Sequence, residues 1–170
     1  KLKGKYIIVC IKLKLRKNPA PNTTYKFINE ELPKIARKPY TIKDACEVIK
    51  KIRIEKLPDP AKIGTAGSFF KNPFISKEKL EELQKICPDF HFYDSNENDD
   101  AIVISAAWLI EAIGFADKKI GGCSVWKKQP LNIVNRGNAT PSEIVELMDA
   151  IKDKIYEKYG IILENEVEII

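Results

Sequence analysis

Histidine and methionine are nearly missing from this 170-residue chain, which has one of each, His91 and Met148. Cysteine is also scarce, and the four residues, at positions 10, 46, 87 and 123, include no C-x-x-C pair. Because zinc sites usually need such paired spacing, we expect no metal site and interpret the cysteines as buried free thiols. With no methionine at its start, the chain is expected to be a piece of a longer protein.

Long apolar runs are absent as well. No stretch approaches the roughly 18 apolar residues of a membrane-spanning helix. The lysine-rich start is not followed by the apolar stretch and small-residue cleavage site of a signal peptide. We therefore expect no membrane partner and a cytoplasmic location. The hydrophobic content of 44% is sufficient for the core of one domain, or of one domain with a piece of another.

The net charge of +5 is modest. A small lysine excess usually reflects a solvated surface, although it would suit a phosphate-bearing substrate. The sequence Trp126-Lys127-Lys128 could stack on a base and contact a phosphate. A basic nucleic-acid-binding module is therefore one alternative function, although we expect no nucleic-acid partner.

Hydrophobic periodicity predicts mixed helices and strands. Alternation over 6–15 predicts a strand, and the polar segment 16–39 is interpreted as a long loop. A helix capped by Thr41 and Asp44 should end before Pro58, and a second should begin at Thr140 with Pro141 and end at Gly160. Further helices are predicted at 76–87 and 105–113, a turn at 91–100, and strands at 101–104, 124–126, 132–134, 161–163 and 167–170. Without regular β-α-β alternation, the fold class is α+β.

The stretch 64–73, with the sequence G-T-A-G-S-F-F-K-N-P, is the most informative part of the chain. It places the hydroxyl of Ser68, the ammonium of Lys71 and the amide of Asn72 around a backbone with two glycines. The glycines permit positive φ and close approach of a ligand, and Pro73 restrains the residue before it. This composition suits a binding or catalytic turn, whereas the plainer interpretation is a glycine turn that leads into a core strand.

The same stretch resembles the serine-bearing motif of the UDP-N-acetylenolpyruvoylglucosamine reductases, flavoenzymes that complete UDP-N-acetylmuramate in peptidoglycan synthesis. The resemblance extends through K-L-P-D-P at 56–60, A-A-W-L-I at 106–110, I-G-G at 120–122 and L-E-N-E-V at 163–167. It covers essentially the whole chain but only the C-terminal half of the family. It implies a remnant of the flavin-binding domain with a substrate-loop insertion at 1–57, and a C-terminal substrate-binding domain at 58–170.

The resemblance also implies roles for individual residues in an oxidoreductase of cell wall biogenesis, on which cell shape and division depend. In that family, FAD takes hydride from NADPH and passes it to the enolpyruvyl group of UDP-N-acetylglucosamine enolpyruvate. Ser68 matches the proton donor, and Glu166 matches a glutamate near the intermediate. The matching substrate-binding residues are Tyr25, Lys56, Asn72 and Gln129, and Arg53 matches an arginine near the flavin.

The flavin domain of that family would precede Lys1. We therefore expect this chain alone to bind no cofactor, to be inactive, and to self-associate as a weak homodimer through apolar surface that the missing domain would cover.

A serine acyl-transfer enzyme is the other alternative. Ser68 and Lys71 fit the S-x-x-K pattern of penicillin-binding proteins and class A β-lactamases, in which the serine becomes acylated. Pro73 lies too close behind for the helix that this pattern requires, and neither S-D-N nor K-T-G occurs in the chain.

Overall fold

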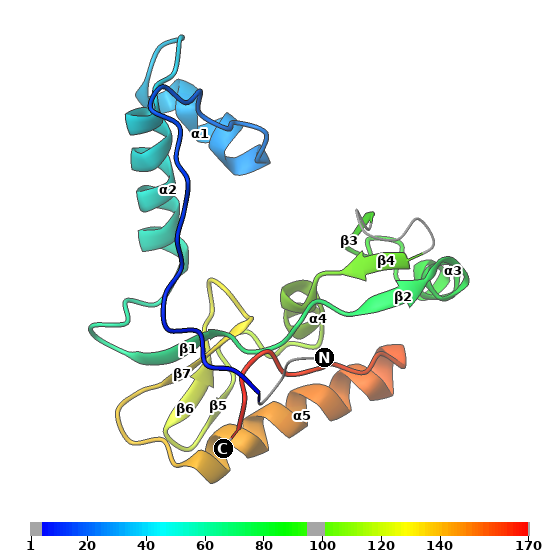
Figure 1. Ribbon diagram of the computed structural model, residues 1–170. Coiled ribbons are helices and arrows are strands. Elements are labelled where there is room, and N and C mark those ends of the chain that lie inside the picture. The colour runs from blue at the N-terminus through cyan, green and yellow to red at the C-terminus, as the bar shows by residue number, and fades with distance from the viewer. Residues whose placement is uncertain (1–4, 95–100, 170) are drawn as a thin grey trace. The chain divides into compact units, whose positions relative to one another are not determined.

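The structure, a computed structural model, describes residues 5–94 and 101–169. The chain divides into two compact units, Lys1–Ile52 and Arg53–Ile170. Helix α2 (Ile42–Lys56) begins in the first unit and ends in the second, and Figure 1 shows the order of the elements. The predicted turn at 91–100 falls partly on residues 95–100, which lie outside the described ranges.

The first unit contains α1 (Lys26–Ile35) and the larger part of α2. The predicted start of α2 is confirmed, since the backbone N–H and hydroxyl of Thr41 both donate to the Asp44 carboxylate, at 2.7 and 2.8 Å. Helix α1 was missed, because Pro33 and the polar composition of 16–39 favoured a loop. Its Leu32 is fully buried, as is Val48 of α2.

The predicted strand at 6–15 is wrong for this chain. None of these residues lies in a strand, and their apolar side chains are exposed, Ile7 at 89% and Val9 at 90%. A strand is stable only when a neighbour accepts and donates its backbone hydrogen bonds, and no described residue pairs with this segment in the sheets. Alternation alone therefore does not make this segment a strand.

The second unit has two antiparallel sheets, and the predicted α+β class is confirmed. The four-stranded sheet has the order β1-β7-β6-β5, and the three-stranded sheet has the order β2-β4-β3. The strands of the first sheet are β1 (Gly64–Ser68), β5 (Lys119–Ile120), β6 (Cys123–Val125) and β7 (Asn132–Asn135). Those of the second are β2 (Phe74–Ser76), β3 (Phe92–Asp94) and β4 (Ala101–Ile104).

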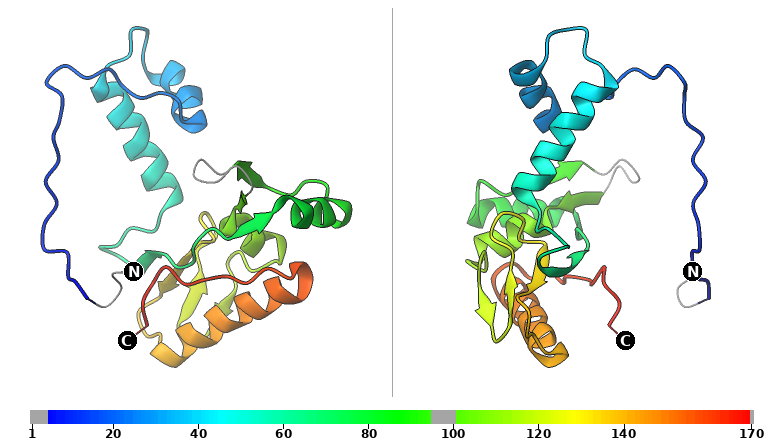
Figure 2. Two further views of the ribbon diagram at one scale, coloured as in Figure 1. Left: turned by 45° about the vertical axis from the view of Figure 1, so that its right-hand side comes forward. Right: turned by 90° about the vertical axis from the view of Figure 1, so that its left-hand side faces the viewer.

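Three helices complete this unit, α3 (Lys77–Ile86), α4 (Ala106–Ala112) and α5 (Pro141–Tyr159). Helix α5 packs against β5 and β6, and α3 packs against β2 and β4 (Figures 1 and 2). The predicted capping box of α5 is confirmed, and Gly160 ends the helix in the left-handed conformation. Leu147, Ile151 and Ile155 of α5 are fully buried in the core.

The C-terminal segment departs from the predicted strands at 161–163 and 167–170, of which residue 170 lies outside the described ranges. The described residues after α5 make one isolated antiparallel bridge, between Asn165 and Phe70. Alternate side chains are still buried, with Ile161 and Leu163 in the core. The hydrophobic periodicity therefore correctly predicted which side chains face the core, although the segment joins neither sheet.

The interpretation of all four cysteines as buried is wrong. Cys10 and Cys46 are exposed, Cys87 is half-buried and only Cys123 is buried, and all four are free thiols. Cys10 lies in the unpaired segment 6–15, so nothing covers it. Burial raises the pKa of the Cys123 thiol, which donates hydrogen bonds to the carbonyls of Ile120 and Glu143, at 3.2 and 3.4 Å.

In the described part of the chain, no helix is long and apolar enough to span a membrane.

Candidate catalytic site

Ser68 lies at the end of β1, immediately after an irregularity in the sheet. β1 pairs with β7 at Gly64 and Thr65, and the register shifts before Ser68 pairs with Asn132. Gly67 provides the extra residue, with a φ of +81°, and its backbone N–H donates to the Thr65 hydroxyl at 3.2 Å. Bulges of this kind re-aim the side chain that follows them. The predicted positive φ in this stretch is confirmed at Gly67.

Two buried phenylalanines fix the chain after Ser68. Phe69 and Phe70 are 4% and 2% exposed, and the backbone N–H of Phe69 donates to the Leu131 carbonyl at 2.8 Å. Ser68 itself is exposed. The backbone at Ser68 is therefore held in place by its buried neighbours, and its hydroxyl is accessible to a ligand.

Glu166 reaches the same region from the C-terminal segment. Its backbone N–H donates to the Phe69 carbonyl at 2.9 Å, and the neighbouring Asn165 forms the bridge with Phe70. Figure 1 shows this last part of the chain running beside the segment that follows β1. The Glu166 side chain is exposed, like that of Ser68. The structure therefore brings the backbones that carry the two predicted catalytic residues together, although they are distant in sequence.

A cavity of about 450 Å³ lies against β1. It combines charged, polar and apolar groups, and its lining includes Arg53, Leu57, Asp59, Thr65, Gly67 and Asn132. The predicted flavin-site residue Arg53 thus shares a cavity with the residue that precedes Ser68. A cavity with apolar walls and a few directed polar groups is typical of a site for a small molecule or cofactor.

Lys56 and Gln129, predicted to bind substrate, are connected through Trp126. The indole N–H of Trp126 donates to the Lys56 carbonyl at 2.9 Å, and its backbone carbonyl accepts from the Gln129 N–H at 3.2 Å. Lys56, Gln129 and Trp126 are all half-buried. Sequence reasoning assigned Trp126 only to the nucleic-acid alternative and missed this connecting role, which no local signal indicates.

Asn72 lies in a second cavity, of about 380 Å³, which is also lined by Lys71, Phe74, Ile162 and Glu164. Its side-chain oxygen accepts the backbone N–H of Ala106 at 3.0 Å, at the start of α4. The structure therefore gives Asn72 a structural partner and places it outside the lining of the first cavity.

The geometry disfavours the S-x-x-K alternative. Ser68 ends a strand, whereas the acylated serine of that pattern begins a helix, and the next helix along the chain starts at Lys77. The Lys71 ammonium is paired with the Glu164 carboxylate at 3.1 Å. Among residues 5–94 and 101–169, no cluster of histidine, cysteine and acidic residues could hold a metal ion.

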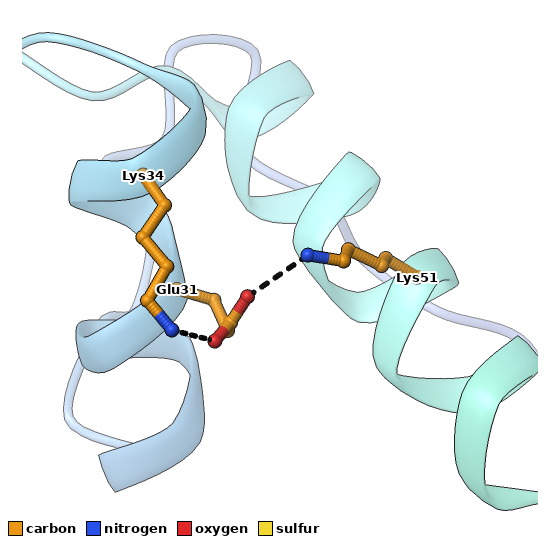
Figure 3. Close-up of polar contacts among 3 residues, drawn as sticks. All are labelled: Glu31, Lys34 and Lys51. Atoms are coloured by element: carbon orange, nitrogen blue, oxygen red, sulfur yellow. Dashed lines mark hydrogen bonds and ion pairs between the residues drawn. The ribbon is translucent and has the colours of Figure 1, made fainter.

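Tyr25 belongs to the first unit, where it precedes α1 and is 72% exposed. Figure 3 shows how α1 is attached to α2: the Glu31 carboxylate lies between the ammonium groups of Lys34 and Lys51. The Lys51 nitrogen is 3.1 Å from one carboxylate oxygen, and Lys34 contacts the other. The hydrogen bonds from Lys34 and then Lys51 lower the pKa of Glu31. The ion pair between Glu31 and Lys51 therefore holds α1, which Tyr25 precedes, against α2.

Taken together, these features define an α+β domain with an exposed serine directly after Gly67, a residue that lines a cavity. Residues 59–170 match the family described as UDP-N-acetylenolpyruvoylglucosamine reductase, C-terminal domain. The chain belongs to this family, and the resemblance inferred from its motifs is confirmed.

Individual relatives agree with the family match. The chain is 39% identical over 170 residues to a UDP-N-acetylenolpyruvoylglucosamine reductase of Flavobacterium johnsoniae, which covers 99% of this chain and 50% of that protein. It is 36% identical over 166 residues to the protein of the same name from Pasteurella multocida, covering 97% and 47%. The one from Buchnera aphidicola is 45% identical over 123 residues, covering 72% and 34%. The chain spans about half the length of the first two relatives.

Proposed function

We propose that this chain is the substrate-binding and proton-donating part of a flavin- and NADPH-dependent reductase. The full-length enzyme converts UDP-N-acetylglucosamine enolpyruvate to UDP-N-acetylmuramate in peptidoglycan synthesis, in the cytoplasm. The family match supports the reaction. The observation that carries the proposal is the hydrogen bond between Glu166 and Phe69, which joins the two predicted catalytic segments at the end of β1.

Ser68 acts as the general acid. It delivers a proton to the carbon next to the one that receives hydride, and such proton transfer typically contributes about 10²–10⁴ in rate. An alcohol is a weak acid, so positioning must supply much of this effect. The bulge at Gly67 and the buried Phe69 supply that positioning, since they fix the backbone on both sides of the serine.

Glu166 acts on the carboxyl end of the same substrate group. Hydride addition to a carbon conjugated with a carboxylate places negative charge on the carboxyl oxygens, and donors must meet that charge. Glu166 serves as a donor when it carries a proton, or as a partner for a cation that binds the substrate carboxylate. Its exposed side chain on the segment beside Phe69 is accessible for either task.

The lining of the cavity at β1 fits part of a flavin. Leu57 and Pro58 offer apolar surface for a ring system, and Arg53 and Asn132 offer donors for its oxygen and nitrogen atoms. A flavin held by these residues would supply the hydride after its reduction by NADPH. Lys56, Gln129 and Asn72 hold the substrate, whose adjacent phosphates need cations and neutral donors. The family resemblance gives Tyr25, in the first unit, a substrate-binding role as well.

The domain assignment belongs to the same proposal. Residues 1–57 are part of the flavin-binding domain, and residues 58–170 form the substrate-binding domain. The family match that begins at residue 59 supports this boundary. The exposed, unpartnered segment 6–15 supports an N-terminal flavin domain as its partner. The isolated chain accordingly neither holds FAD firmly nor turns over.

The test is Ser68→Ala in the full-length enzyme, with the two half-reactions followed separately by flavin absorbance. We expect NADPH to reduce the flavin at the normal rate, and reoxidation by substrate to slow by about 10²–10⁴. Ser142→Ala is the matched control, because it also removes the hydroxyl of an exposed serine but lies on α5, outside the lining of both cavities. Equal slowing of both half-reactions would contradict the role of Ser68.

A further inference from the structure

An ion pair between Lys71 and Glu164 lies close in sequence to the predicted catalytic residues, and neither residue has a role in the reaction proposed above. The backbone N–H of Lys71 donates to the Glu164 carbonyl at 2.9 Å, and the Lys71 ammonium contacts the Glu164 carboxylate at 3.1 Å. The two residues are therefore joined through main chain and side chain, although they are 93 positions apart.

This pair closes one end of a short antiparallel ribbon, formed by residues 69–71 and 164–166. At its centre Phe70 lies opposite Asn165, and at its other end the Glu166 N–H donates to the Phe69 carbonyl. Ser68 and Glu166 both lie at that second end. The register of this ribbon therefore sets which residue stands near Ser68, and a slip by one residue would turn every side chain to the opposite face.

On its inner side the ribbon is anchored by the buried Phe70 and the neighbouring Leu163, but its polar contacts there are weak. Asn165 donates from its side-chain nitrogen to the sulfur of Met148 at 3.1 Å, and thioether sulfur is a weak acceptor. The Asn165 side-chain oxygen is buried and has no hydrogen-bond partner in the described structure. With one bridge and two backbone hydrogen bonds, the ribbon is too short to specify its register by pairing alone.

Two simpler explanations of the pair are less satisfactory. As a contribution to folding it would be small, because both side chains are largely exposed, at 51% and 74%. As a phosphate ligand in the cavity that contains Asn72, Lys71 would have to act beside the Glu164 carboxylate, whose charge repels an anion.

We infer that Lys71 and Glu164 are positioning residues, whose ion pair fixes the register of the ribbon and so the placement of Glu166 relative to Ser68. This inference rests on the proposed reductase function. Neither residue contacts the reacting atoms in this role. Their effect on rate arises because small errors in the position of catalytic groups slow a reaction strongly.

The test is a double-mutant cycle in the full-length enzyme, with Lys71→Met, Glu164→Gln and the two combined. We expect each single variant to lower kcat by about three- to tenfold, with KM for the enolpyruvyl substrate within about twofold. The double variant should be no slower than the singles, since the same interaction is lost in each. Reduction of the flavin by NADPH should stay unchanged.

The pair formed by Lys154 and Glu157 on α5 supplies a matched control. Its side chains are 50% and 69% exposed, close to the values of the inferred pair, and it is likewise a lysine–glutamate contact. Lys154→Met combined with Glu157→Gln should leave kcat unchanged. Hydrogen exchange gives a readout independent of activity: the amides of Lys71 and Glu166 should exchange faster in the variants of the first pair only.

The outcomes separate this inference from the proposed function. If the wild-type full-length protein does not reduce the substrate, the proposed function fails and this role fails with it. If the wild type is active and Glu164→Gln leaves kcat unchanged, the inference alone is overturned. A rise in KM in Lys71→Met without one in Glu164→Gln would also overturn it, because Lys71 would then be a substrate ligand.

Discussion

Gly67→Ala tests whether the bulge before Ser68 serves catalysis. Gly67 has a φ of +81°, which an L-residue adopts only with strain, and an added Cβ would meet no atom within 4 Å. The cost is therefore backbone strain alone, about 1–2 kcal/mol. For a chain of this size, each kcal/mol lowers Tm by roughly 2–4 °C.

The control for this variant is Gly114→Ala. Gly114 follows α4 with a φ of +76°, and an added Cβ there would also meet nothing within 4 Å. The two variants should lose similar stability in thermal unfolding. Only Gly67→Ala should also lower kcat of the full-length enzyme, by about tenfold or more, because relief of the strain moves Ser68.

A different result would refute the reasoning. If Gly67→Ala keeps full turnover while losing the expected stability, the bulge does not aim the Ser68 hydroxyl. If it loses far more stability than Gly114→Ala, the space around Gly67 is not open as the structure has it.

Three further predictions concern Glu166, α5 and the unpaired segment. Glu166→Gln should lower kcat with little change in substrate Kd, because its interaction develops in the transition state, and a large change in Kd at normal turnover would count against it. The Glu143 carboxylate accepts hydrogen bonds from the backbone N–H groups of Thr140 and Gly122, which lower the pKa of Glu143, Thr140 having the larger effect. The carboxylate therefore contributes to stability above the unfolded pKa of about 4.5, and this contribution is lost as pH falls through the folded pKa. Thermal unfolding of Glu143→Gln against wild type should accordingly show a Tm difference at pH 7 that narrows below about pH 4, and a constant difference would reject this. The isolated chain should self-associate weakly through the exposed segment 6–15, and the double substitution Ile7→Ser with Val9→Ser should reduce this self-association. Sedimentation of the wild-type chain as a monomer at high concentration would disprove the prediction.

Elements with strong local signals were predictable from the sequence. The sequence of helix α5 contains the signals for both of its ends, since Thr140 and Glu143 form the capping box and Gly160 takes the left-handed conformation. Helix α1 was not predictable in this way, because Pro33 near its end argues against a helix. The burial of Leu32 is a tertiary feature that its local sequence does not reveal.

Strands proved harder to predict because their stability depends on partners distant in sequence. The segment 6–15 has a strand pattern but no partner among the described residues. Conversely, β1 is rich in glycine and alanine, which are poor strand formers, yet it pairs with β7. The candidate site shows the same limit: motifs pointed to Ser68 and Glu166 singly, whereas the ribbon that joins them is a non-local contact.

Ser68 and Glu166 are proposed to act on one substrate group from the same end of the ribbon. This proposal is tested most directly by a crystal structure of the full-length protein with bound UDP-N-acetylglucosamine enolpyruvate. We expect the Ser68 hydroxyl and the Glu166 carboxyl both to lie within about 3.5 Å of the enolpyruvyl group. A complex in which either side chain points away from that group, with the ribbon intact, would contradict it.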